Sequence, residues 1–271
     1  HGGPGKYAFA PAVASDLPPL PDNFDDAYSE NGQAAIRDWT RRDWQYYIYQ
    51  YHRMVEMVDA EIGRVMDALR ASSYAENTLV LFASDHGDGA GFHANVSKGF
   101  LEEEAFRVPT IAWWPGHIPA NFQDNDHLIS GVDIPATICD YVGAPPLPKA
   151  TIAKSMRPLL EQRSGSWRDY IVGETSIGPL SAAVVEERYK SILFTDHTRL
   201  YDLQDDPLEM RDLSDDPDHA ETLARHRAHF REYITQIEMY SEPENIEQMA
   251  LARGNLYREY IDWYTSVLNE A

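Results

Sequence analysis

Apolar residues recur at helical spacing from Asp43 to about Ala71. Spacings of three and four residues place them on one face of a helix, which predicts a long amphipathic helix whose apolar stripe faces a core. The stripe comprises Tyr47, Tyr51, Met54, Val55, Val58, Ile62, Val65, Met66 and Leu69.

Two short apolar runs follow, from Thr78 to Ala83 and from Val108 to Trp114. A near-continuous apolar run of this length is typical of a strand buried on both faces. We therefore expect the long helix to pack on the first strand. Helix, buried strand, loop and buried strand together predict an α/β fold.

The second half of the chain has a different pattern. A short helix is expected from Gly131 to near Gly143, and two helices, broken around Ser241–Glu244, are expected between Pro217 and Leu268. Between them lie short β-rich runs separated by charged or turn residues, which predicts a small antiparallel sheet. These runs are residues 170–172, 181–185, 189–194 and 199–203.

The pattern suggests a division near residue 150. We expect residues 1–150 to form part of an α/β core, and residues 151–271 to form the small sheet with the terminal helices. The proline-rich residues 1–40 are expected to be a surface connection. Because the chain starts at His1 without a methionine or a visible signal peptide, it is interpreted as a fragment or a processed product.

Charge narrows the range of partners. The chain has 44 Asp and Glu against 23 Lys and Arg, a formal net charge of −21. Such a surface repels phosphate backbones and anionic lipids, so no nucleic-acid partner is expected. No apolar stretch approaches the ~20 residues that span a bilayer, so no membrane partner is expected either. An anionic substrate would need local positive charge in its site.

The candidate chemistry follows the first apolar run. Asp85 and His86 come directly after it, at the carboxyl end of a predicted strand, where open α/β sheets build their sites. A carboxylate and an imidazole together suit a divalent cation, although the same pair also occurs in turns and helix caps. His93 and Lys98 follow in a glycine-rich loop. They are either solvent-facing side chains or donors to a tetrahedral oxyanion.

A set of short motifs, in order from about residue 45 to 215, resembles the C-terminal half of a sulfatase of the alkaline phosphatase superfamily. The motifs are Val58-Asp-Ala-Glu-Ile-Gly-Arg64, Asn77-Thr-Leu-Val, Ser84-Asp-His-Gly87, His93, Lys98, Glu102-Glu103, Arg107-Val-Pro109, Pro115-Gly116, Val132-Asp-Ile-Pro-Ala-Thr137, Gly143, Tyr189-Lys190, Leu200-Tyr-Asp-Leu-Gln-Asp-Asp-Pro207, Glu209 and Leu213. The resemblance implies part of an α/β/α sandwich with a small C-terminal antiparallel sheet and terminal helices.

The resemblance also implies roles. Residues aligned with Asp85 and His86 ligate a divalent cation, usually Ca²⁺, with Mg²⁺, Mn²⁺ or Zn²⁺ as alternatives. The lysine aligned with Lys98 contacts the sulfate and the leaving-group oxygen, and His93 is expected to assist it as a catalytic and substrate-binding residue. A sulfated small molecule or saccharide is the implied substrate, and a periplasmic or secreted location is implied.

The family's nucleophile is a formylglycine made from Cys or Ser in a Cys/Ser-x-Pro/Ala-x-Arg motif. That motif is absent here, since Cys139 is followed by Tyr141 and Gly143 where Pro and Arg are required. The nucleophile and the remaining metal ligands are therefore expected outside this chain, in the N-terminal half of the same protein. The isolated chain is expected to be inactive.

Two alternatives to a sulfatase remain open. A phosphodiesterase or phosphonate hydrolase of the same superfamily also carries Ser-Asp-His-Gly, although Lys98 and the segment Leu200–Leu203 argue against it. A non-catalytic fragment that binds sulfate or metal is the other alternative, supported by the missing nucleophile.

Overall fold

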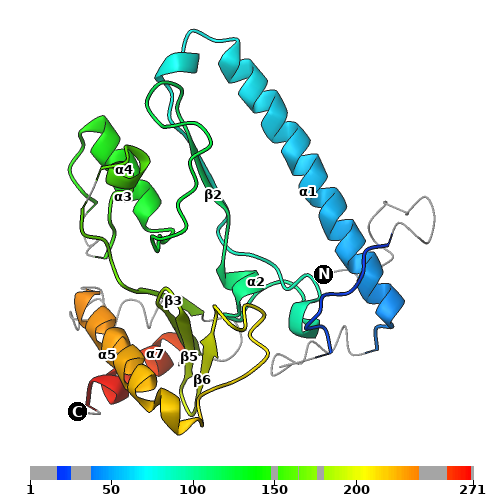
Figure 1. Ribbon diagram of the computed structural model, residues 1–271, viewed down its shortest axis with the longest axis vertical. Helices are drawn as coiled ribbons and strands as arrows, with labels where there is room; N and C mark the ends of the chain where they lie inside the picture. The colour runs from blue at the N-terminus through cyan, green and yellow to red at the C-terminus, as the bar shows by residue number, and fades with distance from the viewer. Residues whose placement is uncertain are drawn as a thin grey trace. The chain divides into compact units, whose positions relative to one another are not determined.

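The computed structural model describes residues 17–25, 38–147, 152–163, 165–175, 180–237 and 255–269 (Figure 1). The chain divides into two compact units, His1–Gly116 and His117–Ala271. The boundary between these units lies before residue 150, and the domain boundary expected near residue 150 stays a prediction. The architecture is mixed α/β, as expected from the sequence.

Helix α1, Arg41–Arg70, confirms the long helix and begins at a capping box. The hydroxyl of Thr40 accepts a hydrogen bond from the backbone N–H of Asp43, whose carboxylate accepts one from the backbone N–H of Thr40. This exchange satisfies two of the donors that a helix start otherwise leaves unpaired. The buried residues of α1 are Trp44, Ile48 and Gln50, all in its first turns.

Strands β1, Val80–Ala83, and β2, Thr110–Trp113, pair antiparallel, with Val80 opposite Trp113 and Ala83 opposite Thr110. Every residue of β1 is half-buried, so burial on both faces, as expected from the apolar run, is not found. The expected packing of α1 on this strand is not found either, because Val58 and Val65 of the helix are 57% and 68% exposed. The described residues leave these apolar surfaces largely uncovered.

Three short helices are the other elements in the described part of the first unit. These are η2, Ala75–Asn77, η3, Phe92–Ala94, and α2, Glu103–Phe106. The proline-rich N-terminal segment contributes to the core here, since Phe24 packs against Trp44 and Val96. Its described part is therefore not only the surface connection expected from its prolines.

The second unit opens with helix α3, Asp133–Val142, which ends at Gly143 in a left-handed conformation with φ of 68°. Helix α4, Arg157–Leu160, follows. Asp133 is fully buried and accepts two hydrogen bonds from the guanidinium of Arg168, at 2.7 and 2.6 Å. This bidentate pair ties the start of α3 to the segment that precedes the sheet.

A four-stranded sheet in the order β3-β4-β5-β6 confirms the predicted antiparallel sheet. Its strands are Ile171–Thr175, Ser181–Val185, Tyr189–Phe194 and Thr198–Asp202. After η4, Pro217–His219, come helices α5, Ala220–Gln236, and α7, Asn255–Asn269. The expected break around 241–244 lies outside the described residues.

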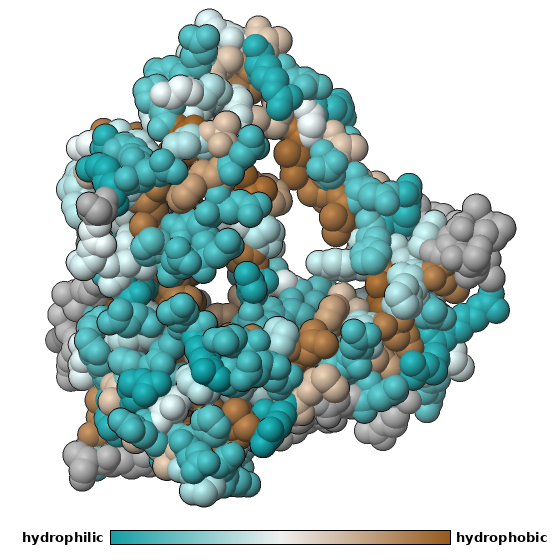
Figure 2. Space-filling view, in the orientation of Figure 1, coloured by the Kyte–Doolittle hydropathy of each residue, from teal (hydrophilic) through white to brown (hydrophobic). Residues whose placement is uncertain are grey.

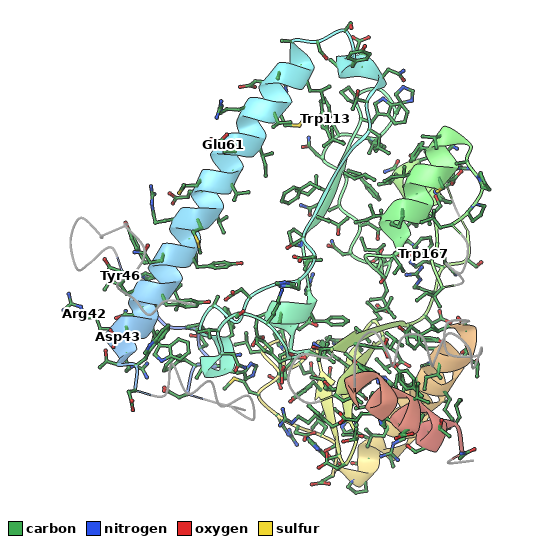
Figure 3. All side chains as sticks on the ribbon, turned by 180° about the vertical axis from the view of Figure 1, so that it is seen from behind. Arg42, Asp43, Tyr46, Glu61, Trp113 and Trp167 are labelled. Carbon is green, nitrogen blue, oxygen red and sulfur yellow. The ribbon has the colours of Figure 1, made fainter. Side chains whose placement is uncertain are left out.

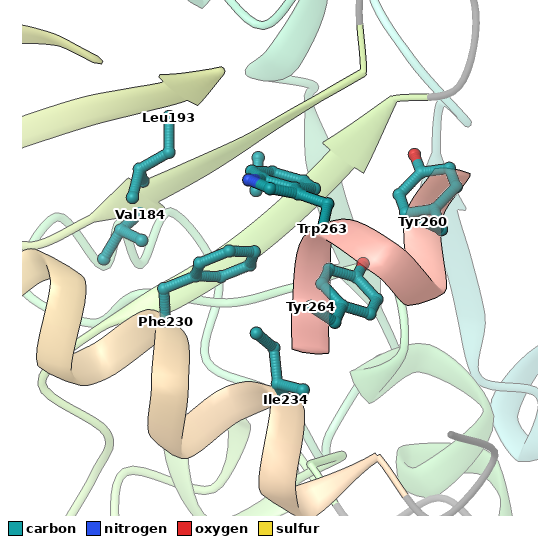
Figure 4. Close-up of a cluster of buried hydrophobic side chains, with 8 residues drawn as sticks. Val184, Leu193, Phe230, Ile234, Tyr260, Trp263 and Tyr264 are labelled. Carbon is teal, nitrogen blue, oxygen red and sulfur yellow. The ribbon is translucent and has the colours of Figure 1, made fainter. Parts of the chain in front are cut away.

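The sheet and the two helices share one apolar core (Figure 4). Phe230 of α5 is fully buried between Val184 of β4 and Trp263 of α7. The ring centroids of Phe230 and Trp263 lie 5.2 Å apart. Aromatic contacts of this kind dominate the energy of small cores. No helix in the described residues has both the length and the apolar character needed to cross a lipid bilayer.

Glu174 of β3 predicts a pH dependence of stability. Burial raises the pKa of its carboxyl to about 7, although the Tyr233 hydroxyl donates a 3.1 Å hydrogen bond to it. Because this folded-state pKa lies above the ordinary 4.5, the native protein holds a proton that the unfolded chain releases. The contribution of Glu174 to the stability of the folded protein is therefore greatest below about pH 4.5 and is lost as the pH rises towards 7.

Glu174→Gln is expected to raise the midpoint of thermal unfolding at pH 8 and to leave it nearly unchanged at pH 5. The gain at pH 8 should be on the order of 1–3 kcal/mol, since one pKa unit corresponds to about 1.4 kcal/mol. The exposed Glu187 supplies the matched control, Glu187→Gln. Equal changes in the unfolding midpoint of the two variants at pH 8 would contradict a raised pKa for Glu174.

Candidate functional site

The site starts where β1 ends. Asp85 and His86 follow Ala83 by two and three residues, and the Asp85 side chain is 83% exposed. The backbone N–H of His86 donates a 3.0 Å hydrogen bond to the carboxylate of Asp85. This bond is the main reason why the pKa of Asp85 lies below its ordinary value. The carboxylate is therefore ionised and open to solvent.

Hydrogen bonds fix the tautomer of His86. Its Nδ1 lies 2.7 Å from the carbonyl of Gly87, which can only accept, so Nδ1 carries the proton. Nε2 is left as an acceptor and lies 2.8 Å from the Nζ of Lys98 and 3.4 Å from the Oδ2 of Asp85. A carboxylate, an imidazole lone pair and an ammonium thus converge at the end of β1, as their order in the sequence suggested.

The loop that carries Lys98 is held by close backbone approaches. Gly87 and Gly89 donate backbone hydrogen bonds to the carbonyls of Ala105 and Ser97, each 2.8 Å long. A Cβ at Gly87 would stand 1.9 Å from the carbonyl oxygen of Glu104, and one at Gly89 would stand 2.5 Å from Asn95. Only glycine therefore fits at these two positions.

The same loop contains an unusual run of left-handed residues. Ala90, His93, Ala94 and Ser97 have φ values of 45°, 47°, 52° and 64°. Such conformations cost energy outside glycine and persist where the surroundings over-determine them, which is typical of functional loops. Close contacts at Gly87 and Gly89 and these left-handed residues thus leave the backbone of the Lys98 loop tightly constrained.

His93 takes a different position from Lys98. It is fully buried, and its Nδ1 lies 3.1 Å from Oε1 of Glu104, while the amide nitrogen of Asn23 lies 3.3 Å from the ring nitrogens. Three segments therefore meet at this imidazole. His93 is buried whereas Asp85 and Lys98 are exposed, and its expected role as a donor to the anion stays a prediction.

Asp88, two residues after His86, makes contacts that the sequence did not indicate. Its Oδ1 accepts a 2.8 Å hydrogen bond from the hydroxyl of Tyr47 in α1 and a 2.9 Å bond from the backbone N–H of Ala90. Burial and the Asp88 charge raise the pKa of Tyr47, so this hydroxyl remains a donor. Tyr47 belongs to the apolar stripe, and its polar contact had no signal in the sequence.

The donors present fit part of a divalent-cation site. The Asp85 carboxylate and the His86 Nε2 lie 3.4 Å apart, and these are the two groups that would hold a cation. In the described ranges no three His, Cys, Asp or Glu side chains gather closely enough to hold a metal ion. Asp85 and His86 thus account for two ligands, fewer than hard divalent cations require.

Two family models match the chain. The model described as Sulfatase matches residues 9–144, and the model described as N-sulphoglucosamine sulphohydrolase, C-terminal, matches residues 91–236. The first includes the end of β1 and the loop of Lys98. The second begins in that loop and includes the antiparallel sheet with α5.

Individual sulfatases are similar to this chain both in sequence and in structure. A Delta 4,5-hexuronate-2-O-sulfatase of Bacteroides thetaiotaomicron is 31% identical over 252 residues, which cover 83% of this chain and 51% of that protein. The solved structure of a 2-O GAG sulfatase superposes with a TM-score of 0.76 at 27% identity, covering 89% of this chain and 58% of that one.

A phosphonate monoester hydrolase of Agrobacterium radiobacter superposes less closely. Its TM-score is 0.63 at 28% identity, and the match covers 73% of this chain and 42% of that one. The chain thus spans about half the length of the hexuronate sulfatase and less of the phosphonate hydrolase. From the model that matches residues 9–144, together with these relatives, the chain belongs to the sulfatase family.

Proposed function

We propose that this chain is the C-terminal part of a sulfuric ester hydrolase that acts on sulfated carbohydrate. The observation that carries the proposal is the convergence of Asp85, His86 and Lys98 at the end of β1. The hexuronate-2-O-sulfatase and the 2-O GAG sulfatase support a sulfated sugar as the substrate class.

In this proposal Asp85 and His86 hold a divalent cation, with Ca²⁺ as the preferred ion. When bound, the cation would withdraw charge from the sulfate oxygens. Lys98 binds the sulfate and donates a proton or a hydrogen bond to the bridging oxygen as the S–O bond breaks. The buried contacts of His93 support a role in holding the loop of Lys98, beside its predicted role as a donor.

The nucleophile and the other metal ligands would come from the N-terminal half of the same protein. The motif for a formylglycine is absent from this chain, and the chain spans 51% of the hexuronate sulfatase. Without a nucleophile, the covalent step has no starting point. A periplasmic or secreted location remains part of the proposal.

Phosphonate monoester hydrolysis is the second candidate, favoured by the superposition on the Agrobacterium enzyme. The two functions differ in the substrate that supports turnover. A non-catalytic fragment that binds sulfate or metal is the third candidate, and it predicts turnover of neither substrate under any condition.

The isolated chain is expected to give no turnover of a 2-O-sulfated unsaturated disaccharide in the presence of Ca²⁺. Turnover is expected when the chain is joined to, or co-expressed with, the polypeptide encoded directly upstream of it. Released sulfate is measured, and a phosphonate monoester is assayed in parallel. Preference for the phosphonate ester would favour the second candidate, and inactivity of the joined protein on both substrates would favour the third.

A further inference from the structure

Helix α1 and the loop of Lys98 meet at the hydroxyl of Tyr47. Apolar surface lies along this helix in the space-filling view (Figure 2), and Tyr47 belongs to the apolar stripe predicted from the sequence. Its hydroxyl donates a 2.8 Å hydrogen bond to Oδ1 of Asp88. The backbone N–H of Ser97 donates to the oxygen of the same hydroxyl. These two hydrogen bonds are here called the Tyr47 bridge, because they join two separate points of the loop to one helix.

Both partners of the Tyr47 bridge lie close to site residues along the chain. Asp88 follows His86 by two residues, and Ser97 directly precedes Lys98. The Nζ of Lys98 lies 2.8 Å from the Nε2 of His86. A displacement of the backbone at Asp88 or at Ser97 would therefore change the distance between these two nitrogens.

The ring of Tyr47 is itself held on the helix. It packs against Trp39 and Trp44, with ring centroids 5.6 and 6.4 Å from its own. Figure 3 labels its neighbour Tyr46 in the first turns of α1. Groups that are supported by packed helical side chains hold their positions more precisely than groups on loops. The hydroxyl is thus anchored outside the loop that it contacts.

The Tyr47 bridge acts where the loop backbone is unfavourable. Ala90 and Ser97 are both in the left-handed conformation, which persists outside glycine where the surroundings over-determine it. The N–H of Ala90 donates a 2.9 Å hydrogen bond to the same Oδ1 of Asp88 that accepts from Tyr47. Each of these two left-handed residues therefore donates its N–H to one member of the hydroxyl–carboxylate pair.

We infer that Tyr47 is a positioning residue for the proposed hydrolysis, because its hydroxyl bridges Asp88 and Ser97 and so holds His86 and Lys98 beside each other. The inference rests on the proposed function and adds a residue of α1 to the groups on which that function depends. Tyr47 acts through Lys98 and His86, and it need not contact the substrate.

Nuclear Overhauser spectra of the 271-residue chain test the inference without relying on activity. The ring protons of His86 are expected to show a contact with the Cε protons of Lys98, because Nε2 and Nζ lie 2.8 Å apart. Tyr47→Phe removes the hydroxyl alone, and it is expected to abolish this contact and to speed amide exchange at Ser97 by ~tenfold or more. Retention of the contact in Tyr47→Phe, or its absence from the unsubstituted chain, would overturn the inference.

Tyr49→Phe is the matched control. Tyr49 lies on the same helix and its ring contacts that of Tyr46, but its hydroxyl makes no hydrogen bond in the described part of the chain. This variant is expected to keep the contact between His86 and Lys98 and to change amide exchange at Ser97 by less than ~twofold. Loss of the contact in both variants would overturn the inference, since any loosening of α1 would then have the same effect.

A double variant tests whether Tyr47 and Asp88 act as one unit. Asp88→Ala is expected to speed amide exchange at Ser97 and to abolish the contact between His86 and Lys98, as Tyr47→Phe does. Exchange at Ser97 in Tyr47→Phe/Asp88→Ala should be no faster than in Asp88→Ala alone, because residues in one hydrogen-bond network are not additive. Fully additive effects would contradict the bridge.

Kinetics of the chain joined to the polypeptide encoded directly upstream separate positioning from a purely structural role. Tyr47→Phe is expected to lower kcat by ~tenfold and to change KM by less than ~twofold, because misplacement of a catalytic group affects the transition state most. Tyr47→Phe/Lys98→Ala should be no slower than Lys98→Ala alone, and a further loss would overturn the inference. Loss of the contact between His86 and Lys98 in Tyr47→Phe, together with a joined protein that is inactive without any substitution, would leave the positioning assigned and count against the proposed hydrolase.

Discussion

Lys98→Ala in the complete sulfatase is expected to lower kcat by about 10²–10³ on a substrate with a poor leaving group. As the sulfate ester breaks, negative charge builds on the bridging oxygen, and a fixed ammonium stabilises this transition state more than the ground state. In the proposed function the loop around Lys98 would supply that fixation, since its glycines lie too close to neighbouring backbone for any other residue to fit.

Lys98→Arg should restore little activity, because a planar guanidinium does not replace a compact point charge. The loss should shrink for substrates with good leaving groups, which need less help at the bridging oxygen. Lys154→Ala is the matched control, because Lys154 is another exposed lysine, positioned over the ring of Trp167. A change in kcat within about twofold for Lys98→Ala would mean that Lys98 is an ordinary surface lysine.

Lys190→Ala is expected to destabilise the chain by about 3–5 kcal/mol. The Nζ of Lys190 in β5 lies 2.8 Å from Oε1 of Glu209, and both side chains are fully buried. Removing the ammonium takes the charge partner at 2.8 Å away from the buried carboxylate of Glu209, which is the costly outcome for such pairs. Urea unfolding of the 271-residue chain measures the loss.

The double variant Lys190→Met/Glu209→Leu is expected to recover much of that loss, because it removes both charges of the buried pair. Arg70→Ala, which removes an exposed ion pair with Asp67, should leave the urea midpoint nearly unchanged. If Lys190→Ala behaves like Arg70→Ala, the buried pair does not stabilise the subdomain.

Periodicity predicted the elements well wherever the pattern is local. The strands Ser181–Val185 and Tyr189–Phe194 agree with the sequence prediction at both ends, and the long helix agrees within two residues. The burial of β1 and the packing of α1 were predicted wrongly for a single reason. An apolar pattern shows that a surface needs a partner but does not show whether the described chain contains that partner.

The candidate site was predictable in part for a similar reason. Asp85 and His86 follow a strand and so could be placed at its end, and Lys98 lies near them along the chain. The burial of His93 was not predictable, because it depends on Glu104 and on Asn23, which is 70 residues away in the sequence. Contacts across such distances leave no periodic signal.

The tight loop also has a consequence for the choice of expression host. Asn95, Val96 and Ser97 match the acceptor sequence for N-linked glycosylation, yet Asn95 is 7% exposed and its backbone lies against Gly89. A eukaryotic secretory pathway can attach the glycan to the nascent chain, before this loop has closed. A sugar at Asn95 has no room in the folded loop, so chains modified there would fail to form the support for Lys98. Bacterial expression avoids this modification and is the suitable source of protein for all of the experiments above.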